Sequence, residues 1–182
     1  MSYLLRQSKG LLVIALAGAS LFAEAASQGT KGNTSSGSAQ VSSSVPNKIR
    51  ISGLTDLALG EWSGSGGQSG TISDICVWST TRGYNLTATG SLTGGAFGLV
   101  HSTDSSYEVP FTVTWDDGDG DAVDALTAGT NVAGLTADSK TNQCNNPSDV
   151  TASLGVAITE ANLEAVIAGS YAGTINLTVA PE

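Results

Sequence analysis

The chain has 182 residues, of which 7 are Lys or Arg and 16 are Asp or Glu, so its formal net charge at pH 7 is −9. A negative balance of this size repels phosphate backbones and anionic lipids, which argues against nucleic acid as a partner. Charged residues make up 13% of the chain and Gly is frequent, a composition that favours strands and tight turns over long solvent-exposed helices.

The first 25 residues have the pattern of a secretory signal peptide. Arg6 and Lys9 precede an apolar run from Leu11 to Phe22, which ends at the small-residue site Ala23-Glu24-Ala25. A run of about a dozen apolar residues is too short for a permanent membrane helix, which needs roughly 20. We expect residues 1–25 to be cleaved, although an uncleaved anchor is the alternative. The mature chain then carries 5 basic and 15 acidic residues, a formal charge of −10, and no membrane span.

Residues 26–46 form a low-complexity segment of Ser, Gly and Thr, here called the N-terminal arm. By composition it is a flexible linker or arm. Residues 47–182 are then expected to form a single domain, because about 157 mature residues are enough for one core. The apolar side chains of the N-terminal arm are Ala26, Ala39, Val41 and Val45.

Alternating apolar and polar residues predict about seven to eight short strands in the domain. The clearest alternation covers Tyr84–Ala88, which we expect to form a hairpin with the strand that contains Cys76. One long strand is predicted over Tyr107–Trp115, with Pro110 marking an edge position or a bulge. At most one helical turn is expected, near Ala161–Ile167, so the fold class is all-β, a sandwich or barrel. Other strands are predicted around Ile49–Ile51, Ala96–Val100, Ala152–Ile158 and Tyr171–Val179.

Two cysteines remain after processing, Cys76 and Cys144. In an exported protein they are expected to form a disulfide, because the periplasm oxidises thiols. A metal pair or a reactive thiol is the alternative, but neither cysteine has a neighbouring His or a second Cys. Cys76 alternates in phase with Ile72 and Trp78, so we predict that it points towards the core.

The acidic segment from Asp116 to Asp121 is the best candidate for a metal site. Asp117, Asp119 and Asp121 alternate like the start of a calcium-binding loop, and Ca²⁺ prefers oxygen ligands. However, Ala122 stands where the EF-hand pattern needs glycine, and the closing acidic residue is absent. A solvated hairpin loop is the favoured interpretation, with a weak surface calcium site as the alternative.

No residue pattern predicts catalysis or a cofactor. His101 is the single histidine, and its surroundings show neither a nucleophile elbow nor a zinc pattern. A Ser-His-Asp arrangement would use residues that are distant along the chain, which sequence spacing does not reveal. Trp62, Trp78 and Trp115 either fill the core or stack against sugars at the surface. We expect Trp78 and Trp115 to face the core.

Four segments, in this order, resemble one known domain family. They are Leu59-Gly60-Glu61-Trp62, then Ile72-Ser73-Asp74-Ile75-Cys76 followed by Tyr84-Asn85-Leu86, then Tyr107-Glu108-Val109, and finally Ala168 to Val179. They correspond to a hydrophobic-Gly-aromatic stretch, a cysteine strand with its hairpin partner, a tyrosine strand and a closing strand. This order resembles the spore coat protein U-like domain, the module of archaic chaperone–usher pilins.

The resemblance implies an immunoglobulin-like β-sandwich of the pilin type that lacks one strand. A periplasmic chaperone, an usher and neighbouring subunits are then the implied partners, and the chaperone and subunits supply the strand by β-augmentation. On this basis we expect an exported structural subunit of a fimbria-like or cell-surface assembly, not an enzyme. The competing hypothesis is a monomeric secreted adhesin or carbohydrate-binding β-sandwich.

The N-terminal arm departs from the pilin pattern. A donor strand should alternate apolar residues over about eight to ten positions, whereas residues 26–46 are mostly Ser, Gly and Thr. Either the segment from Val41 to Ile51 donates a strand, or the domain is complete by itself.

Overall fold

The computed structural model describes residues 26–121, 123–138, 144 and 152–182. Its contacts divide the chain into two units, one ending at Ser44 and one from Val45 to Glu182. The predicted signal peptide lies outside the described residues. Residues 26–44 are exposed throughout, and a short bridge pairs Ser27 with Ser38 through two backbone hydrogen bonds of 3.0 Å.

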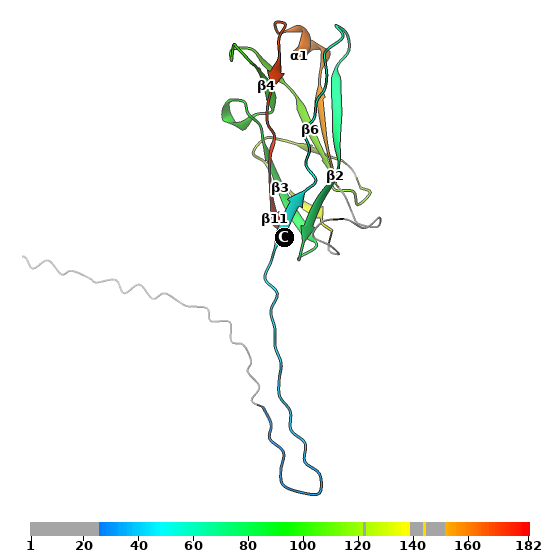
Figure 1. Cartoon of the computed structure of the whole chain (residues 1–182), viewed down its shortest axis with the longest axis vertical. Helices are drawn as coiled ribbons and strands as arrows, with labels where there is room; N and C mark the ends of the chain where they lie inside the picture. Colours follow the sequence, from blue (N-terminus) through cyan, green and yellow to red (C-terminus); the bar gives the residue numbers. More distant parts are fainter. Residues whose placement is uncertain (1–25, 122, 139–143, 145–151) are drawn as a thin grey trace, which may run out of the picture. The chain divides into compact units, whose positions relative to one another are not determined.

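The second unit consists almost entirely of strands, which confirms the predicted all-β fold (Figure 1). The described residues contain eleven strands, one 3₁₀ turn at Thr93–Gly95 and one short helix, α1 (Glu160–Glu164). The strands are β1 (Ile49–Ser52), β2 (Gln68–Ser79), β3 (Gly83–Thr89), β4 (Gly98–His101), β5 (Glu108–Pro110), β6 (Thr112–Asp116), β7 (Asp124–Leu126), β8 (Asn131–Thr136), β9 (Ala152–Ile158), β10 (Tyr171–Ala172) and β11 (Asn176–Pro181).

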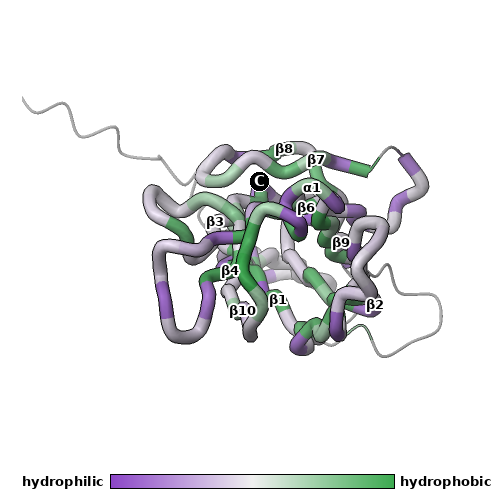
Figure 2. Tube along the Cα trace, turned by 90° about the horizontal axis from the view of Figure 1, so that it is seen from above, coloured by the Kyte–Doolittle hydropathy of each residue, from purple (hydrophilic) through white to green (hydrophobic). Residues whose placement is uncertain are grey.

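The strands form three antiparallel sheets. The largest has the order β1-β2-β9-β6-β7, and the two smaller ones have the orders β10-β4-β5 and β11-β3-β8. Strands β2 and β3 therefore lie in different sheets, and the predicted hairpin between the Cys76 strand and the Tyr84 strand is wrong. Figure 1 shows β3, β11 and β1 towards one end of the domain and β4 and α1 towards the other. Hydrophobic residues follow β4 and β9 in Figure 2, while many of the connecting loops are hydrophilic.

The core lies between the large sheet and the two smaller ones. Trp115 and Tyr84 are fully buried at its centre, and the indole Nε1 of Trp115 donates a 2.7 Å hydrogen bond to the Tyr84 hydroxyl. This bond satisfies both polar groups away from water. The predicted core position of Trp115 is therefore confirmed. Other buried members of the core are Ile75, Val77, Leu86, Ala88, Phe97, Val109, Phe111, Val113, Leu126, Leu135, Ala137, Ala152, Leu154, Val156 and Ile158.

A β-bulge in β2 changes which residues face the core. The register of β2 against β9 shifts between Ile72 and Ile75, and Asp74 adopts a left-handed conformation with φ 61°. After this extra residue, Ile75 and Val77 join the core. Because strand side chains alternate, Cys76 and Trp78 lie on the opposite face. The prediction that Cys76 and Trp78 point into the core is therefore wrong.

Two of the predicted strands are each divided between two sheets. The expected Tyr107–Trp115 strand breaks at Phe111, so that β5 pairs with β4 while β6 pairs with β9. Pro110 ends β5, which is an edge strand as its missing N–H predicted. The closing segment likewise divides into β10 and β11. These divisions, together with β7 and β8, raise the number of strands above the predicted seven to eight.

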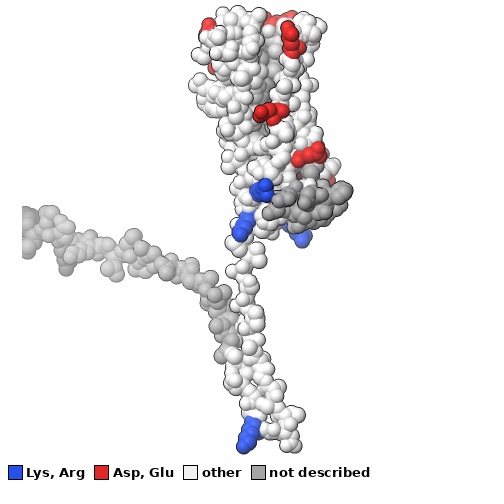
Figure 3. Space-filling model, viewed as in Figure 1, with Lys and Arg blue, Asp and Glu red and all other residues white. Residues whose placement is uncertain are grey.

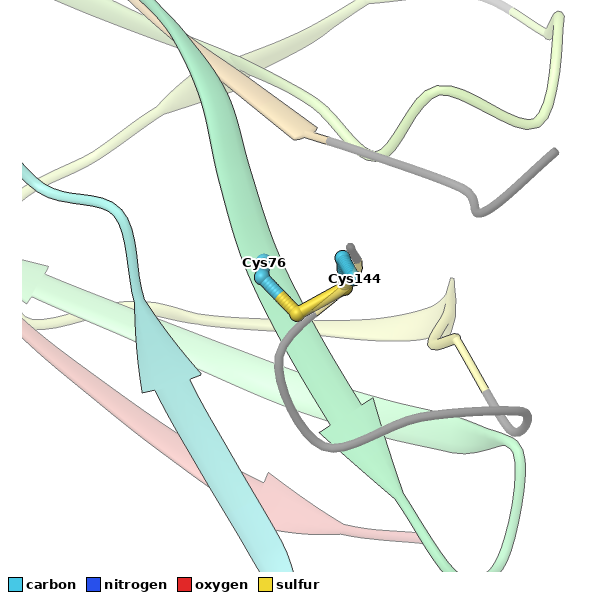
Figure 4. The surroundings of a disulfide bond; sticks show 2 residues. All are labelled: Cys76 and Cys144. Atoms are coloured by element: carbon cyan, nitrogen blue, oxygen red, sulfur yellow. A yellow bond between two sulfur atoms is a disulfide. The ribbon is translucent and has the colours of Figure 1, made fainter. Parts of the chain in front are cut away.

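Cys76 and Cys144 form the predicted disulfide (Figure 4). Their Cα atoms are 5.6 Å apart, and the bond closes a loop with a sequence separation of 68. Cys76 is 3% exposed although it lies on the face of β2 that points away from the core. The disulfide therefore fastens a distant part of the chain to the outer face of the large sheet.

Helix α1 is a single capped turn, close to the position where one helical turn was predicted. The Thr159 hydroxyl accepts a hydrogen bond from the backbone N–H of Asn162, and the Asn162 side chain donates to the Pro110 carbonyl. Among the described residues, no helix has the length and apolar character needed to cross a membrane.

Candidate functional site

Strand β11 is paired along one side only in the described part of the chain. It runs antiparallel to β3, with Asn176 opposite Thr89 and Pro181 opposite Tyr84. The N–H of Glu182 donates to the Gly83 carbonyl. Backbone groups of successive strand residues point to opposite sides, so those of Leu177, Val179 and Pro181 point away from β3. We call this side the free edge of β11.

Pro181 fits the free edge for a simple reason. A proline has no N–H, and at this position a ladder N–H towards β3 is not required. The free edge therefore presents the N–H groups of Leu177 and Val179, and the row of donors stops at Pro181. Pro181 is a residue of the candidate site that alternation alone does not reveal, although a proline at the end of an alternating run is a signal of an edge strand.

Apolar side chains around the free edge are packed against the core but remain partly exposed. Strand β1 lies next to β11 and itself forms an edge of the large sheet (Figure 1). Among the described residues, each of these two strands is paired on one side only, so part of its inward side chains stays in contact with water. The partly exposed apolar residues of β1, of β11 and of the segments before β2 and β11 are Ile49, Ile51, Leu57, Leu59, Ile175, Leu177 and Val179.

Residues 53–62 continue from β1 without joining a sheet in the described part of the chain. Leu57 and Leu59 of this segment cover Gly70 of β2, where an added Cβ would come within 2.9 Å of both side chains. The Gln68 amide holds the segment by donating to the carbonyls of Leu59 and Gly60. The segment is thus anchored by side chains, while no strand pairs with its backbone.

The structure limits which residues can serve as a donor strand. Ile49 to Ser52 already pair with Ser79 to Cys76 of β2, so the last three residues of the predicted Val41–Ile51 donor are occupied in their own sheet. Val41 and Val45 are 94% and 79% exposed. Two isolated valines among serines match the alternation of a donor strand poorly.

The acidic turn brings the three predicted carboxylates together. Oxygen atoms of Asp117, Asp119 and Asp121 lie within 4.8 Å of one another. The buried Asp117 accepts a 2.6 Å hydrogen bond from the N–H of Thr136, and Asp119 accepts one from the Thr136 hydroxyl. Asp119 and Asp121 also donate their own N–H groups to Asp117 and Asp119, respectively. These bonds are those of a self-supporting turn, and the calcium interpretation stays a prediction.

Burial and mutual contact move the pKa values of these carboxyl groups in different directions. Burial raises the pKa of Asp117, although hydrogen bonds from Thr136 and Asp119 oppose the shift. The hydrogen bond from the Asp121 N–H lowers the pKa of Asp119, and contact with Asp119 raises the pKa of Asp121.

Figure 3 shows acidic side chains spread along the domain and basic ones near one end.

Trp62 and Trp78 lie outside the core and are partly exposed. The Trp62 indole donates to the Gly66 carbonyl, and the Gly66 N–H in turn donates to the Glu160 carboxylate. Trp78 sits opposite Arg50 of β1 on the outer face of β2. The two tryptophans are well separated along β2 and the loop before it, so they do not form one aromatic platform.

The sequence matches no family model and no curated protein. The fold is similar to a chain of the chaperone–tip adhesin complex described as vital for synergistic activation of CFA/I fimbriae biogenesis, with a TM-score of 0.52 and 19% identity, covering 74% of this chain and 42% of that chain. It also matches CfaE, the adhesive subunit of CFA/I fimbria of enterotoxigenic Escherichia coli, with a TM-score of 0.47 and 21% identity, covering 66% of this chain and 38% of that chain. The chain thus spans less than half the length of either solved chain. The first likeness shows that the β-sandwich is of a kind found in a fimbrial complex.

Proposed function

We propose that this protein is an exported structural subunit of a fimbria-like or cell-surface assembly, and that it accepts a β-strand along the free edge of β11. The observation that carries the proposal is the free edge itself, flanked by apolar side chains that remain partly exposed. The fold similarity to a chain of a fimbrial chaperone–adhesin complex supports it, as does the signal-peptide pattern of residues 1–25.

An added strand would stabilise the domain in two ways. Its backbone would pair with the N–H and C=O groups of Leu177 and Val179, which have no strand partner on that side among the described residues. Its alternating side chains would cover the partly exposed apolar residues of β1 and β11, at roughly 25 cal/mol per Å² of apolar area removed from water. A periplasmic chaperone during export, and a neighbouring subunit at the surface, are the partners that we propose for this role.

The protein acts in this proposal as an acceptor of a strand. The N-terminal arm is too polar to fill successive apolar positions of a neighbouring copy, and Ile49 and Ile51 are already paired. The incoming strand therefore comes from a different protein, with apolar residues at every second position. An usher-dependent route to the cell surface belongs to the same proposal.

The test uses the purified protein and a synthetic peptide that alternates Val and Thr over about nine residues, with a lysine at each end for solubility. We expect the peptide to raise the melting temperature and to bind with measurable affinity in fluorescence anisotropy. A soluble monomer whose stability is indifferent to the peptide would overturn the acceptor role.

Two variants separate the free edge from the paired edge of β11. Val179→Pro removes an N–H that points to the free edge, and we expect peptide affinity to fall by about fivefold to tenfold with β3–β11 pairing retained. Thr178→Pro removes an N–H that points to β3, so it should lower the stability of the free protein instead. Equal loss of peptide affinity and of stability in both variants would contradict the assignment of the two edges.

A monomeric binding domain is the second candidate function. The observation that favours it is that Trp62 and Trp78 lie outside the core and keep part of their rings exposed, because exposed aromatic rings stack on sugars. Binding of an oligosaccharide that is lost in Trp62→Ala or Trp78→Ala, together with indifference to the strand peptide, would favour an adhesin over a subunit. In either case the proposed role is non-enzymatic.

A further inference from the structure

His101 at the end of β4 has an unusual set of hydrogen-bond donors around one ring nitrogen. The side chain is 8% exposed, and its Nδ1 lies 3.3 Å from the N–H nitrogen of Thr103 and 3.2 Å from that of Asp104. The Thr103 hydroxyl is also 3.3 Å away. A ring nitrogen that accepts from backbone N–H groups carries no hydrogen, so the ring is neutral with its hydrogen on Nε2.

The same ring holds β10 against β4. Tyr171 of β10 pairs with His101, and the two rings meet edge to face with their centroids 4.9 Å apart. Next to this pair, the N–H of Ser102 donates to the Ser170 carbonyl at 2.9 Å. The Gly169 backbone lies so close to the ring that an added Cβ would collide with Nε2. The His101 side chain, at the end of β4, therefore contacts both the loop 102–107 and the segment 169–172.

We propose that His101 is an acid-sensitive latch, which holds the loop 102–107 and β10 on β4 while the ring is neutral and releases them when Nδ1 takes up a proton. The proton comes from water and forms an N–H bond at Nδ1. The ring then donates at both nitrogens and accepts at neither, so Thr103 and Asp104 lose the acceptor for their N–H groups.

Three titratable side chains face the ring in the described part of the chain. They are Tyr171 from β10, Tyr107 from the segment before β5, and Asp104 from the loop. The Asp104 carboxylate is engaged elsewhere, since it accepts from the N–H and the hydroxyl of Ser106. These hydrogen bonds lower the pKa of Asp104. The contribution of Asp104 to stability is therefore lost only below about pH 4, whereas histidine side chains change charge between about pH 5 and 8.

Release of β10 from β4 would also affect the candidate site at β11. From Ala172 the chain continues through Gly173 and Thr174 to β11, and the Thr174 N–H is held by the Ser91 hydroxyl. Acid would thus loosen the segment that leads into the free edge. This consequence rests on the proposed function, whereas the latch itself does not.

The experiment uses the single histidine of the chain, whose ring gives one set of signals in NMR. The ring titration is compared with hydrogen exchange of the amides of Ser102, Thr103, Asp104 and Ala172, corrected for intrinsic rates, between about pH 7.5 and 5. We expect their protection to fall by about tenfold or more as the ring is protonated, while the β9 amides stay protected. Unchanged protection after the ring has titrated would overturn the latch, and so would a ring that stays neutral until the whole domain unfolds.

Two variants make the interpretation specific. His101→Asn places a carbonyl oxygen near the position of Nδ1, so it keeps an acceptor that takes up no proton in this range, and we expect its exchange to be independent of pH. Asp104→Asn should retain the wild-type pH dependence, because His101 is unchanged. If Asp104→Asn abolishes the effect instead, the aspartate and not the histidine is the switch. Strand-peptide binding plays no part in these measurements, so failure of the proposed function would leave them interpretable.

Discussion

Strands β9 and β11 have the same alternation of apolar and polar residues but different surroundings. Strand β9 lies between β2 and β6, and its inward side chains Leu154, Val156 and Ile158 are 3%, 8% and 3% exposed. Strand β11 has β3 on one side, and its inward side chains Leu177 and Val179 stay partly exposed although they pack against the same core.

The difference shows what alternation does and does not determine. The pattern of a strand decides which face turns to the core, because side chains alternate. How deeply that face is buried depends on the neighbours on both sides. At β11 the apolar area left in water therefore follows from the edge position of the strand and not from a change in the strand's own residues.

The largest expected effect on stability concerns the large sheet, in which β9 lies beside β2 and its disulfide. Replacing both cysteines, Cys76→Ser with Cys144→Ser, removes the disulfide that fastens the outer face of β2. We expect the free energy of unfolding to fall by about 4 kcal/mol, because the bond restrains a long loop in the unfolded chain. Urea denaturation with and without the change measures it, and peptide affinity at β11 should stay the same. A loss below about 1 kcal/mol would show that the bond contributes little.

The next effect compares one leucine from each strand. Leu154→Ala should lower the free energy of unfolding by about 3 kcal/mol, and Leu177→Ala by about half as much, since Leu177 is only partly buried. The same measurement in the presence of a bound strand peptide should bring the two values closer together. Equal costs in the free protein would mean that β11 is already as well covered as β9.

The smallest effect concerns Tyr84, which pairs with Pro181 of β11 and whose hydroxyl accepts the Trp115 hydrogen bond. Burial raises the pKa of Tyr84 above its ordinary value. The folded protein thus holds this proton more tightly than the unfolded chain does, so stability is fully present below about pH 10 and is lost as the pH rises above it. Tyr84→Phe should cost about 1 kcal/mol at neutral pH and flatten the alkaline loss. Urea denaturation at several alkaline pH values tests this, and identical slopes for both proteins would contradict it.

The alternation of apolar and polar residues was sufficient to predict much of the fold, and the wrong predictions have identifiable causes. It placed Trp115 in the core and Pro110 at a sheet edge. It misplaced Trp78, because the left-handed conformation of Asp74 inserts one residue and nothing in the sequence marks that bulge. It missed β8, in which Gly134 also has a positive φ of 80° and interrupts the alternation.

The candidate site was predictable in part. The alternation around Leu177 and Val179 identified the closing strand and its inward face. Their exposure could not be read from the sequence, because it depends on which strands pair with β11 in space. The hydrogen bond from Thr136 to Asp117 likewise joins the end of β8 to the acidic turn, 19 positions apart in the chain.

Pro181 has a consequence for how this molecule meets copies of itself. An open strand edge with alternating apolar residues is a template on which identical strands can stack into fibrils. A copy laid along β11 would find no amide donor at Pro181, so the row of backbone hydrogen bonds would end there. The proline thus shortens the ladder of backbone hydrogen bonds that an identical copy could form along β11, while the outward N–H groups of Leu177 and Val179 remain available to a short strand of the right register.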